Sequence, residues 1–121
     1  MPQLDKYISC FESYFKKPSF NNEIMQVVDF LKSRKKLFFI GNGGSNGICS
    51  HMYQDFAKIA GFKTFAFSDP SLITCYANDY GYENSIKEWL KIYFDEESVL
   101  IAVSSSGNSM NIVNAIEQAK I

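Results

Sequence analysis

Two loops rich in glycine, serine and asparagine carry the residues best suited to bind an anion. Residues 41–45 (Gly-Asn-Gly-Gly-Ser) follow one apolar run, and residues 104–109 (Ser-Ser-Ser-Gly-Asn-Ser) follow another. Backbone N–H groups at the start of a helix bind phosphate, glycines allow the backbone to approach closely, and serine hydroxyls add donors. We therefore expect both loops to face one phosphate group. The alternative for residues 104–109 is a helix N-cap with a polar loop, because serine and asparagine also favour caps.

His51 and Asp55 are the second candidates for chemistry, since their spacing places both on one face of a helix. A histidine–carboxylate pair beside a bound carbonyl compound can move protons or hold one metal ion. The alternative is a solvated pair, which is common on helix surfaces and contributes little. Asp79 has two similar interpretations: it forms a turn, or its carboxylate accepts hydrogen bonds from sugar hydroxyls.

A dinucleotide is the competing ligand for the first loop. Gly41 and Gly43 match part of a Gly-x-Gly-x-x-Gly fingerprint, but Asn46 stands where that fingerprint has glycine or alanine. In this interpretation Asp69, near the second strand, would bind the ribose. The fingerprint leaves the serine-rich loop without a role, so we expect no nucleotide cofactor.

Composition argues against several other classes of function. The chain has 121 residues, is 46% hydrophobic and carries a net charge of −1, which indicates a globular protein that does not bind nucleic acid. No apolar segment reaches the roughly 18 residues that would span a membrane. The three cysteines lack a Cys-x-x-Cys spacing and predict reduced thiols in a cytoplasmic protein.

The elements that must position these residues follow from hydrophobic periodicity. Apolar spacing predicts two helices before the first strand, and apolar runs at 37–40, 63–67 and 99–103 predict three strands alternating with helices. A turn is expected at residues 78–81. The helical stripes expected to face a core are Ile24, Val27, Val28 and Leu31; Ile48, Cys49, Met52, Tyr53, Phe56, Ala57 and Ala60; Ile86, Trp89, Leu90, Tyr93 and Phe94; and Ile112, Val113, Ile116 and Ala119.

This alternation predicts an α/β fold with a flavodoxin-like parallel sheet in the strand order 2-1-3. Ligands of such sheets bind where the strand order reverses, beyond the carboxyl ends of the strands, so this topology brings the two loops together. We expect one domain over residues 1–121, with N-terminal helices at 1–35 and a β/α core at 36–121. The third strand would be an apolar edge, which we expect further strands or a partner to cover.

These motifs together resemble those of the phosphoheptose isomerases in the sugar isomerase (SIS) domain family, in the same order. The resemblance runs from about residue 36 to 120 and rests on Gly41-Asn42-Gly43-Gly44-Ser45, on His51 with Asp55, on Asn78-Asp79-Tyr80-Gly81-Tyr82 and on Ser104-Ser105-Ser106-Gly107-Asn108-Ser109. It implies a homotetramer or homodimer with active sites at subunit interfaces. It also implies interconversion of sedoheptulose 7-phosphate and D-glycero-D-manno-heptose 7-phosphate, for bacterial lipopolysaccharide or capsule.

The resemblance also implies roles for individual residues. His51 and Asp55 stand where the family has a zinc-ligand histidine and a glutamate that is both ligand and catalytic base, which implies one zinc ion per site. Asn42, Gly43 and Asp79 would contact the sugar. The residues implied to hold the phosphate are Ser45, Ser104, Ser105, Ser106 and Ser109.

The chain departs from the family in ways that leave two functions open. Asp55 is one methylene shorter than the family's glutamate. The family's second catalytic histidine and a glutamine lie on a later helix, so we expect this chain to be incomplete at its C-terminus. It is therefore either an isomerase with Asp55 as base, or a non-catalytic SIS-type domain that binds or senses a sugar phosphate.

Overall fold

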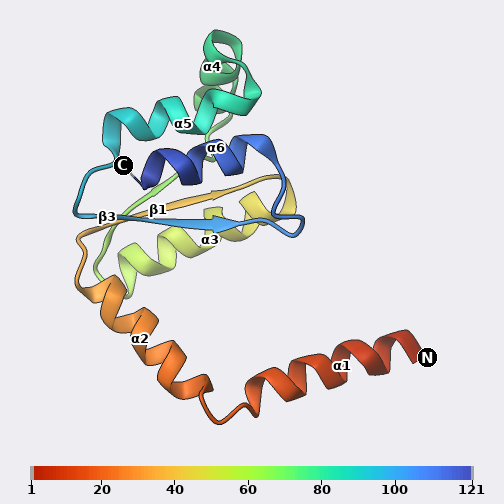
Figure 1. The fold of residues 1–121 in the computed structure, drawn as a ribbon. Helices are drawn as coiled ribbons and strands as arrows, with labels where there is room; N and C mark the ends of the chain where they lie inside the picture. The colour runs from red at the N-terminus through yellow and green to blue at the C-terminus, as the bar shows by residue number, and fades with distance from the viewer. Residues whose placement is uncertain (1, 121) are drawn as a thin grey trace. The chain divides into compact units, whose positions relative to one another are not determined.

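A computed structural model describes residues 2–120 (Figure 1). The chain divides into two compact units, of which the first ends at Ser33 and the second begins at Arg34. This division falls close to the predicted boundary between the N-terminal helices and the β/α core. No helix within residues 2–120 is long and apolar enough to cross a membrane.

Two helices make up the first unit, as their apolar spacing predicts. They are α1 (Pro2–Phe15) and α2 (Phe20–Lys32). The rings of Tyr14 and Phe15 meet the ring of Phe20 edge to face, at centroid distances of 5.5 and 5.3 Å. These aromatic contacts hold the connection between the two helices.

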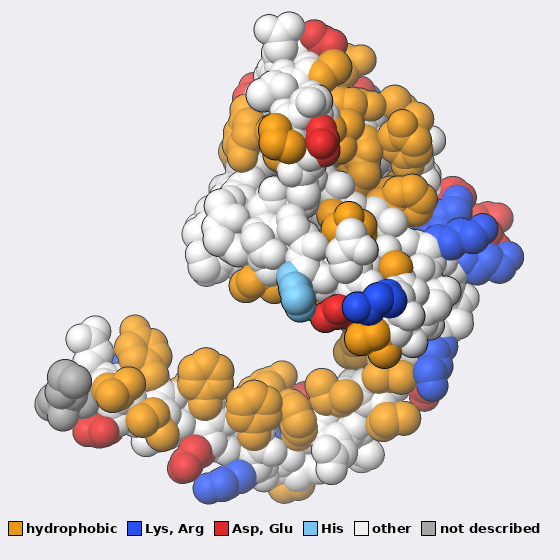
Figure 2. All heavy atoms as spheres, turned by 180° about the vertical axis from the view of Figure 1, so that it is seen from behind, with side chains coloured by type: hydrophobic (Ala, Val, Ile, Leu, Met, Phe, Trp, Pro, Cys, Tyr) orange, Lys and Arg blue, Asp and Glu red, His pale blue; other side chains and the backbone are white. Residues whose placement is uncertain are grey.

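The prediction that α2 buries an apolar stripe is wrong within this unit. None of the described residues of α2 is buried, because two helices alone cannot enclose a core. Apolar side chains consequently lie on the surface of both helices, as Figure 2 shows. The exposed ones are Leu4, Tyr7, Ile8, Phe11, Tyr14 and Phe15 in α1, and Ile24, Met25, Val27 and Phe30 in α2.

A three-stranded parallel sheet forms the centre of the second unit. Its strands β1 (Lys36–Gly41), β2 (Lys63–Ala66) and β3 (Ser98–Val103) lie in the order β2-β1-β3. This confirms the predicted α/β fold and strand order. The register pairs Gly41 of β1 with Val103 of β3, so the two strands end side by side.

Helices cover both faces of this sheet (Figure 1). The helix α3 (Gly44–Lys58) covers one face, and α5 (Tyr82–Tyr93) and α6 (Met110–Ala119) cover the other, while α4 (Pro70–Tyr80) packs against α5. The side chains of β1 alternate between the faces: Phe39 meets Phe56 of α3, whereas Phe38 and Ile40 pack with α5 and α6. The continuous apolar run of β1 is therefore buried on both sides, as expected for a central parallel strand.

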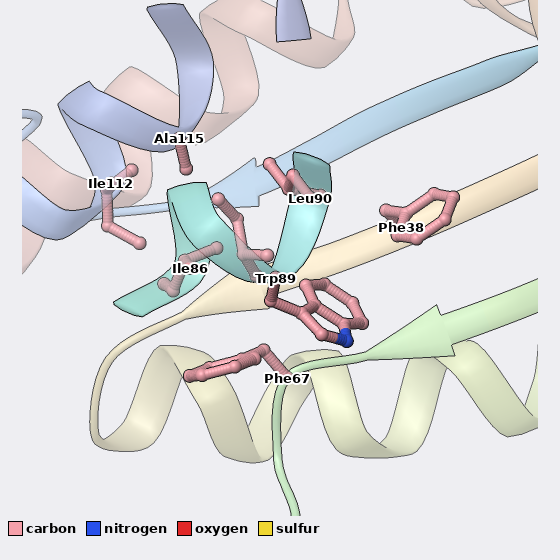
Figure 3. Packing of buried hydrophobic residues seen from close by; sticks show 8 residues of the cluster. Phe38, Phe67, Ile86, Trp89, Leu90, Ile112 and Ala115 are labelled. Carbon is pink, nitrogen blue, oxygen red and sulfur yellow. The ribbon is translucent and has the colours of Figure 1, made fainter. Parts of the chain in front are cut away.

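The main core lies between β1 and the helices α5 and α6 (Figure 3). Trp89 packs edge to face on Phe38 with their centroids 5.4 Å apart, and Ile86 and Leu90 are buried on the same side of α5. The apolar stripe predicted for α5 thus supplies this core, although Tyr93 stays about half exposed.

Three local predictions need correction. Residues 78–80 belong to α4 rather than to a turn, and the chain breaks only at Gly81, which has a φ of 76°. In α6 the buried face comprises Asn111, Ile112 and Ala115, while Ile116 is exposed. In α3 Cys49 is the one buried residue and Ile48 is 52% exposed, because only a thin side of this helix faces the sheet.

Gly41 is expected to be the least replaceable glycine of the first loop. A Cβ at this position would lie 2.8 Å from the backbone carbon of Ser45 and 3.0 Å from the backbone nitrogen of Asn46. Gly41→Ala should therefore lower the free energy of unfolding by about 1–3 kcal/mol in urea titrations. The control is Gly44→Ala, where a Cβ meets nothing within 4 Å. Equal stabilities of the two variants would contradict this close approach.

Candidate functional site

The two predicted loops leave neighbouring strands at the same edge of the sheet. One begins at Asn42 after β1 and the other at Ser104 after β3, and the preceding residues Gly41 and Val103 are paired in register. In the first loop Gly43 has a φ of 52°, a left-handed value that glycine adopts without strain. This geometry brings the two loops together, as the topology predicts.

The serine-rich loop is partly held by its own hydroxyls. Ser104 Oγ accepts from the backbone N–H of Gly107 (3.1 Å), and Ser106 Oγ accepts from that of Asn108 (3.3 Å). Ser109 is the N-cap residue of α6 by position, yet its side chain makes no capping hydrogen bond. The loop is thus a local turn that also carries hydroxyls, but Ser109 does not form the capping hydrogen bond of the alternative interpretation.

A cluster of polar side chains joins the first loop to two helices. Asn42 Nδ2 donates to Asn111 Oδ1 (2.9 Å), and Asn111 Nδ2 donates back to Asn42 Oδ1 (2.8 Å). The hydroxyl of Tyr82 also donates to Asn42 Oδ1 (2.9 Å). The amide of Asn42 is therefore fixed by one side chain from α6 and one from α5.

A second polar link joins the start of α3 to the end of β2. Asn46 Nδ2 donates to the carbonyl of Phe67 (3.3 Å), and Ser68 Oγ donates to Asn46 Oδ1 (2.9 Å). Asn46 thus stands where the dinucleotide fingerprint has a small residue, and it ties the loop to the neighbouring strand instead.

A small pocket opens beside these polar groups. Its volume is about 140 Å³, and Asn42, Tyr82 and Asn111 line it on the polar side. The remaining lining residues are Gly41, Gly43, Asn46, Phe67, Ile73 and Ile86. Of the residues predicted to bind substrate, Asn42 and Gly43 line this pocket, whereas Ser45, Asp79 and the serines of the second loop do not.

His51 and Asp55 form the expected pair but lie outside this pocket. His51 Nε2 is 3.2 Å from Asp55 Oδ2, with side chains 81% and 44% exposed. Asp55 also borders a shallow apolar depression of about 220 Å³ with Phe56, Ile59 and Ala60. Such an exposed pair contributes little to stability. A partner surface placed over it would be needed to exclude water from any reaction there.

His51 and Asp55 have side chains of types that bind metal ions. A histidine and a carboxylate at positions i and i+4 of a helix can bind one zinc ion from the same side. Protein zinc sites use three or four ligands, and no group of three or more His, Cys, Asp and Glu side chains is present within residues 2–120. His51 and Asp55 therefore fit as part of a zinc site rather than as a whole one.

The two remaining acidic candidates have local partners. Asp79 lies exposed on α4, where Asn78 Nδ2 donates to Asp79 Oδ1 (3.0 Å). Asp69 is the N-cap of α4, and its Oδ1 accepts from the backbone N–H groups of Ser71 (2.9 Å) and Leu72 (3.0 Å). Capping therefore gives Asp69 a structural role that accounts for this residue without a ribose ligand.

Sequence reasoning did not single out Asn111 or assign a role to Tyr82. A signal for Asn111 existed: it is a polar residue one helical turn before Ala115, on the face of α6 that is otherwise apolar. Tyr82 ends the motif at residues 78–82, but that motif does not reveal its contact with Asn42, which joins residues far apart in the chain.

Comparisons with known proteins agree with this geometry. The family model described as "SIS domain" matches residues 15–121. The chain is 41% identical over 100 residues to a phosphoheptose isomerase of Fusobacterium nucleatum, an alignment that covers 78% of this chain and 52% of that protein. It is 30% identical over 127 residues to one of Cytophaga hutchinsonii, covering 98% and 66%. The chain spans about half the length of the first curated relatives it matches.

Solved structures show the same fold. A phosphoheptose isomerase from Francisella tularensis superposes with a TM-score of 0.68 at 26% identity, covering 99% of this chain and 71% of the other. One from Neisseria gonorrhoeae gives a TM-score of 0.72 at 23% identity, covering 98% and 69%.

Proposed function

The chain belongs to the SIS domain family, and on that premise we propose that it binds and isomerises a phosphorylated heptose. The substrate pair is sedoheptulose 7-phosphate and D-glycero-D-manno-heptose 7-phosphate. The main support is the convergence of the loops after β1 and β3, in a chain whose relatives are phosphoheptose isomerases. In this proposal the protein acts in the cytoplasm, in the synthesis of bacterial surface polysaccharide.

The two loops bind the phosphate in this proposal. Backbone N–H groups at the starts of α3 and α6 favour an anion, and serine hydroxyls add donors. Asn42, Gly43 and Asp79 contact the sugar. The serines that hold the phosphate are Ser45, Ser104, Ser105, Ser106 and Ser109.

Aldose–ketose exchange requires a proton to move between adjacent carbons. Asp55 takes the proton from the hydroxyl-bearing carbon next to the carbonyl, which gives an enediol, and returns it to the former carbonyl carbon. The hydroxyl on the neighbouring carbon loses its proton to become the new carbonyl, and the former carbonyl oxygen gains one to become a hydroxyl. His51 orients the Asp55 carboxylate and, when protonated, donates toward the carbonyl oxygen as negative charge develops there. Alternatively, a zinc ion held by His51 and Asp55, with ligands from elsewhere, would polarise that oxygen as a Lewis acid, and His51 would then be a metal ligand instead of a proton donor.

Because His51 and Asp55 are exposed and lie outside the pocket, we propose that a second copy of the protein completes the site. The assembly is a homodimer or homotetramer with residues 1–121 of each subunit acting as one SIS-like domain. The exposed apolar side chains of α1 and α2 offer surface for such an assembly.

The proposal is tested with the full-length natural protein and sedoheptulose 7-phosphate. We expect conversion to the aldose, and reaction of the product with an aldose-specific reagent measures this conversion. Inorganic phosphate should compete, because it occupies the same loops. Absence of both sugar-phosphate binding and turnover would reject the proposal.

A non-catalytic sugar-phosphate-binding or regulatory domain is the second candidate. It is favoured by the shorter Asp55 in place of the family's glutamate. Tight binding of the sugar phosphate without any isomerisation by the full-length protein would select it, and efficient turnover would eliminate it.

A further inference from the structure

Asn111 is a polar side chain on the buried face of α6. It is 3% exposed and lies next to Ile112 and one turn before Ala115, both of which belong to the apolar core. Burying an amide without hydrogen bonds is costly. Within residues 2–120 the Asn111 side chain forms two hydrogen bonds, both with Asn42. Asn111 is thus explained by its contact with the first loop rather than by packing.

The hydrogen bonds of Asn42 leave it one free group. Its Oδ1 has two acceptor sites, which Asn111 Nδ2 and the Tyr82 hydroxyl fill at 2.8 and 2.9 Å. Its Nδ2 has two hydrogens, of which one goes to Asn111 Oδ1. Asn42 is only partly buried and lines the pocket. What it offers to a ligand is therefore a single N–H donor.

We propose that Asn111 is a positioning residue that fixes the amide of Asn42, so that Asn42 donates to an oxygen acceptor of the bound sugar phosphate. The inference rests on the proposed function and adds two things to it. It names a residue that borders the pocket but acts through Asn42, and it gives Asn42 the role of donor only. A carbonyl or hydroxyl oxygen of the sugar is the matching ligand group.

The same pair couples the two loops. Asn111 lies in the first turn of α6, directly after the serine-rich loop, while Asn42 lies in the first loop. The reciprocal amide pair holds the two loops at one spacing before a ligand arrives. Binding then requires less ordering of the site, which favours affinity.

A double-mutant cycle in the full-length protein tests this role. The variants are Asn42→Ala, Asn111→Ala and the double variant, and calorimetry measures the Kd for sedoheptulose 7-phosphate. Each single variant should weaken binding by about 10-fold, the value of one or two lost hydrogen bonds. Because Asn111 acts through Asn42, the double variant should be no weaker than Asn42→Ala alone.

The matched control is Asn114→Ala on the same helix. Asn114 Nδ2 donates to the backbone carbonyl of Glu83 (2.9 Å), so this change removes a link between α6 and α5 without touching Asn42. It should leave the Kd for the sugar phosphate unchanged. Asn111→Thr, which fills a similar volume but cannot form the reciprocal pair, replaces Asn111→Ala if the alanine variant does not fold.

The outcomes distinguish failure of the inference about Asn111 from failure of the proposed function. If Asn111→Ala weakens binding further in the Asn42→Ala background, Asn111 acts through general structure and the inference is wrong. Inorganic phosphate, which offers no sugar oxygen, should lose less affinity than the sugar phosphate, and an equal loss for both ligands would overturn the donor role of Asn42. If the unmodified protein binds no sugar phosphate, the proposed function fails first and the inference fails with it.

Discussion

Asp55→Asn is expected to lower kcat for sedoheptulose 7-phosphate by about 10²–10⁴-fold, the usual contribution of a general base. The amide keeps the size of the carboxylate, and its oxygen can still lie near His51 Nε2, which is 3.2 Å from Asp55 Oδ2. The substitution therefore removes the base while leaving the shape of α3 intact. Steady-state kinetics of the full-length protein measures the effect, and KM should change much less than kcat.

Glu117→Gln is the matched control for this substitution. Glu117 is also an exposed carboxylate on a helix with a nearby cation, Lys120 at 2.7 Å. Its neutralisation should leave kcat unchanged, because an exposed pair of this kind contributes little. Full turnover by Asp55→Asn would show that Asp55 is not the base and would move that role to another residue.

Asp55→Glu distinguishes an impaired isomerase from a binding domain. A base misplaced by about 1 Å can cost on the order of 100-fold in rate, and the longer side chain restores the residue implied by the family resemblance. A rise in kcat would indicate that the chain is an isomerase whose catalytic base, Asp55, has too short a side chain. An unmodified protein and an Asp55→Glu variant that both bind without turnover would favour the regulatory alternative.

Phe38→Ala is expected to have the largest effect on stability, lowering the free energy of unfolding by about 3–5 kcal/mol. Phe38 is fully buried on the central strand. Its ring stacks on Phe65 at 4.6 Å and meets Trp89 and Phe94 edge to face at 5.4 and 5.3 Å. Truncation would leave a cavity that three aromatic neighbours cannot close. The loss is a large share of the 5–15 kcal/mol typical of a domain.

Urea unfolding followed by tryptophan fluorescence measures this loss, since Trp89 contacts the substituted ring. The control is Ile92→Ala on α5, whose side chain is 64% exposed. It should change stability by no more than about 0.5 kcal/mol. A similar midpoint for both variants would contradict a core built around Phe38.

Local patterns predicted the elements well and their buried faces less well. In α6 a stripe containing Ile112 and Ile116 was expected, but the helix is rotated so that Ala115 faces the core and Ile116 is exposed. Apolar spacing alone does not distinguish these choices, because a helix with several apolar residues has more than one plausible inward face. The packing of α5 against α6 decides between them.

Local sequence patterns also misassigned residues 78–80, before Gly81, as a turn. Asn78 and Asp79 are weak helix formers and common turn residues. Nevertheless α4 continues through Tyr80, since Tyr76 packs on Phe67 at a centroid distance of 6.1 Å and on Tyr80 at 5.8 Å. Tertiary contacts of the aromatic side chains outweigh the local preference of two residues.

The amino-acid sequence by itself determined the order of strands and helices, the parallel sheet and the meeting of the two loops after β1 and β3. These features follow from short-range signals: apolar runs, glycines where the backbone must turn, and the handedness of crossovers. Only the tertiary structure decided that Asn42 is held by Asn111 and Tyr82, and that His51 and Asp55 stay exposed. The reason is physical: Asn42 and Asn111 are 69 residues apart in sequence, and only folding brings such side chains within hydrogen-bonding distance.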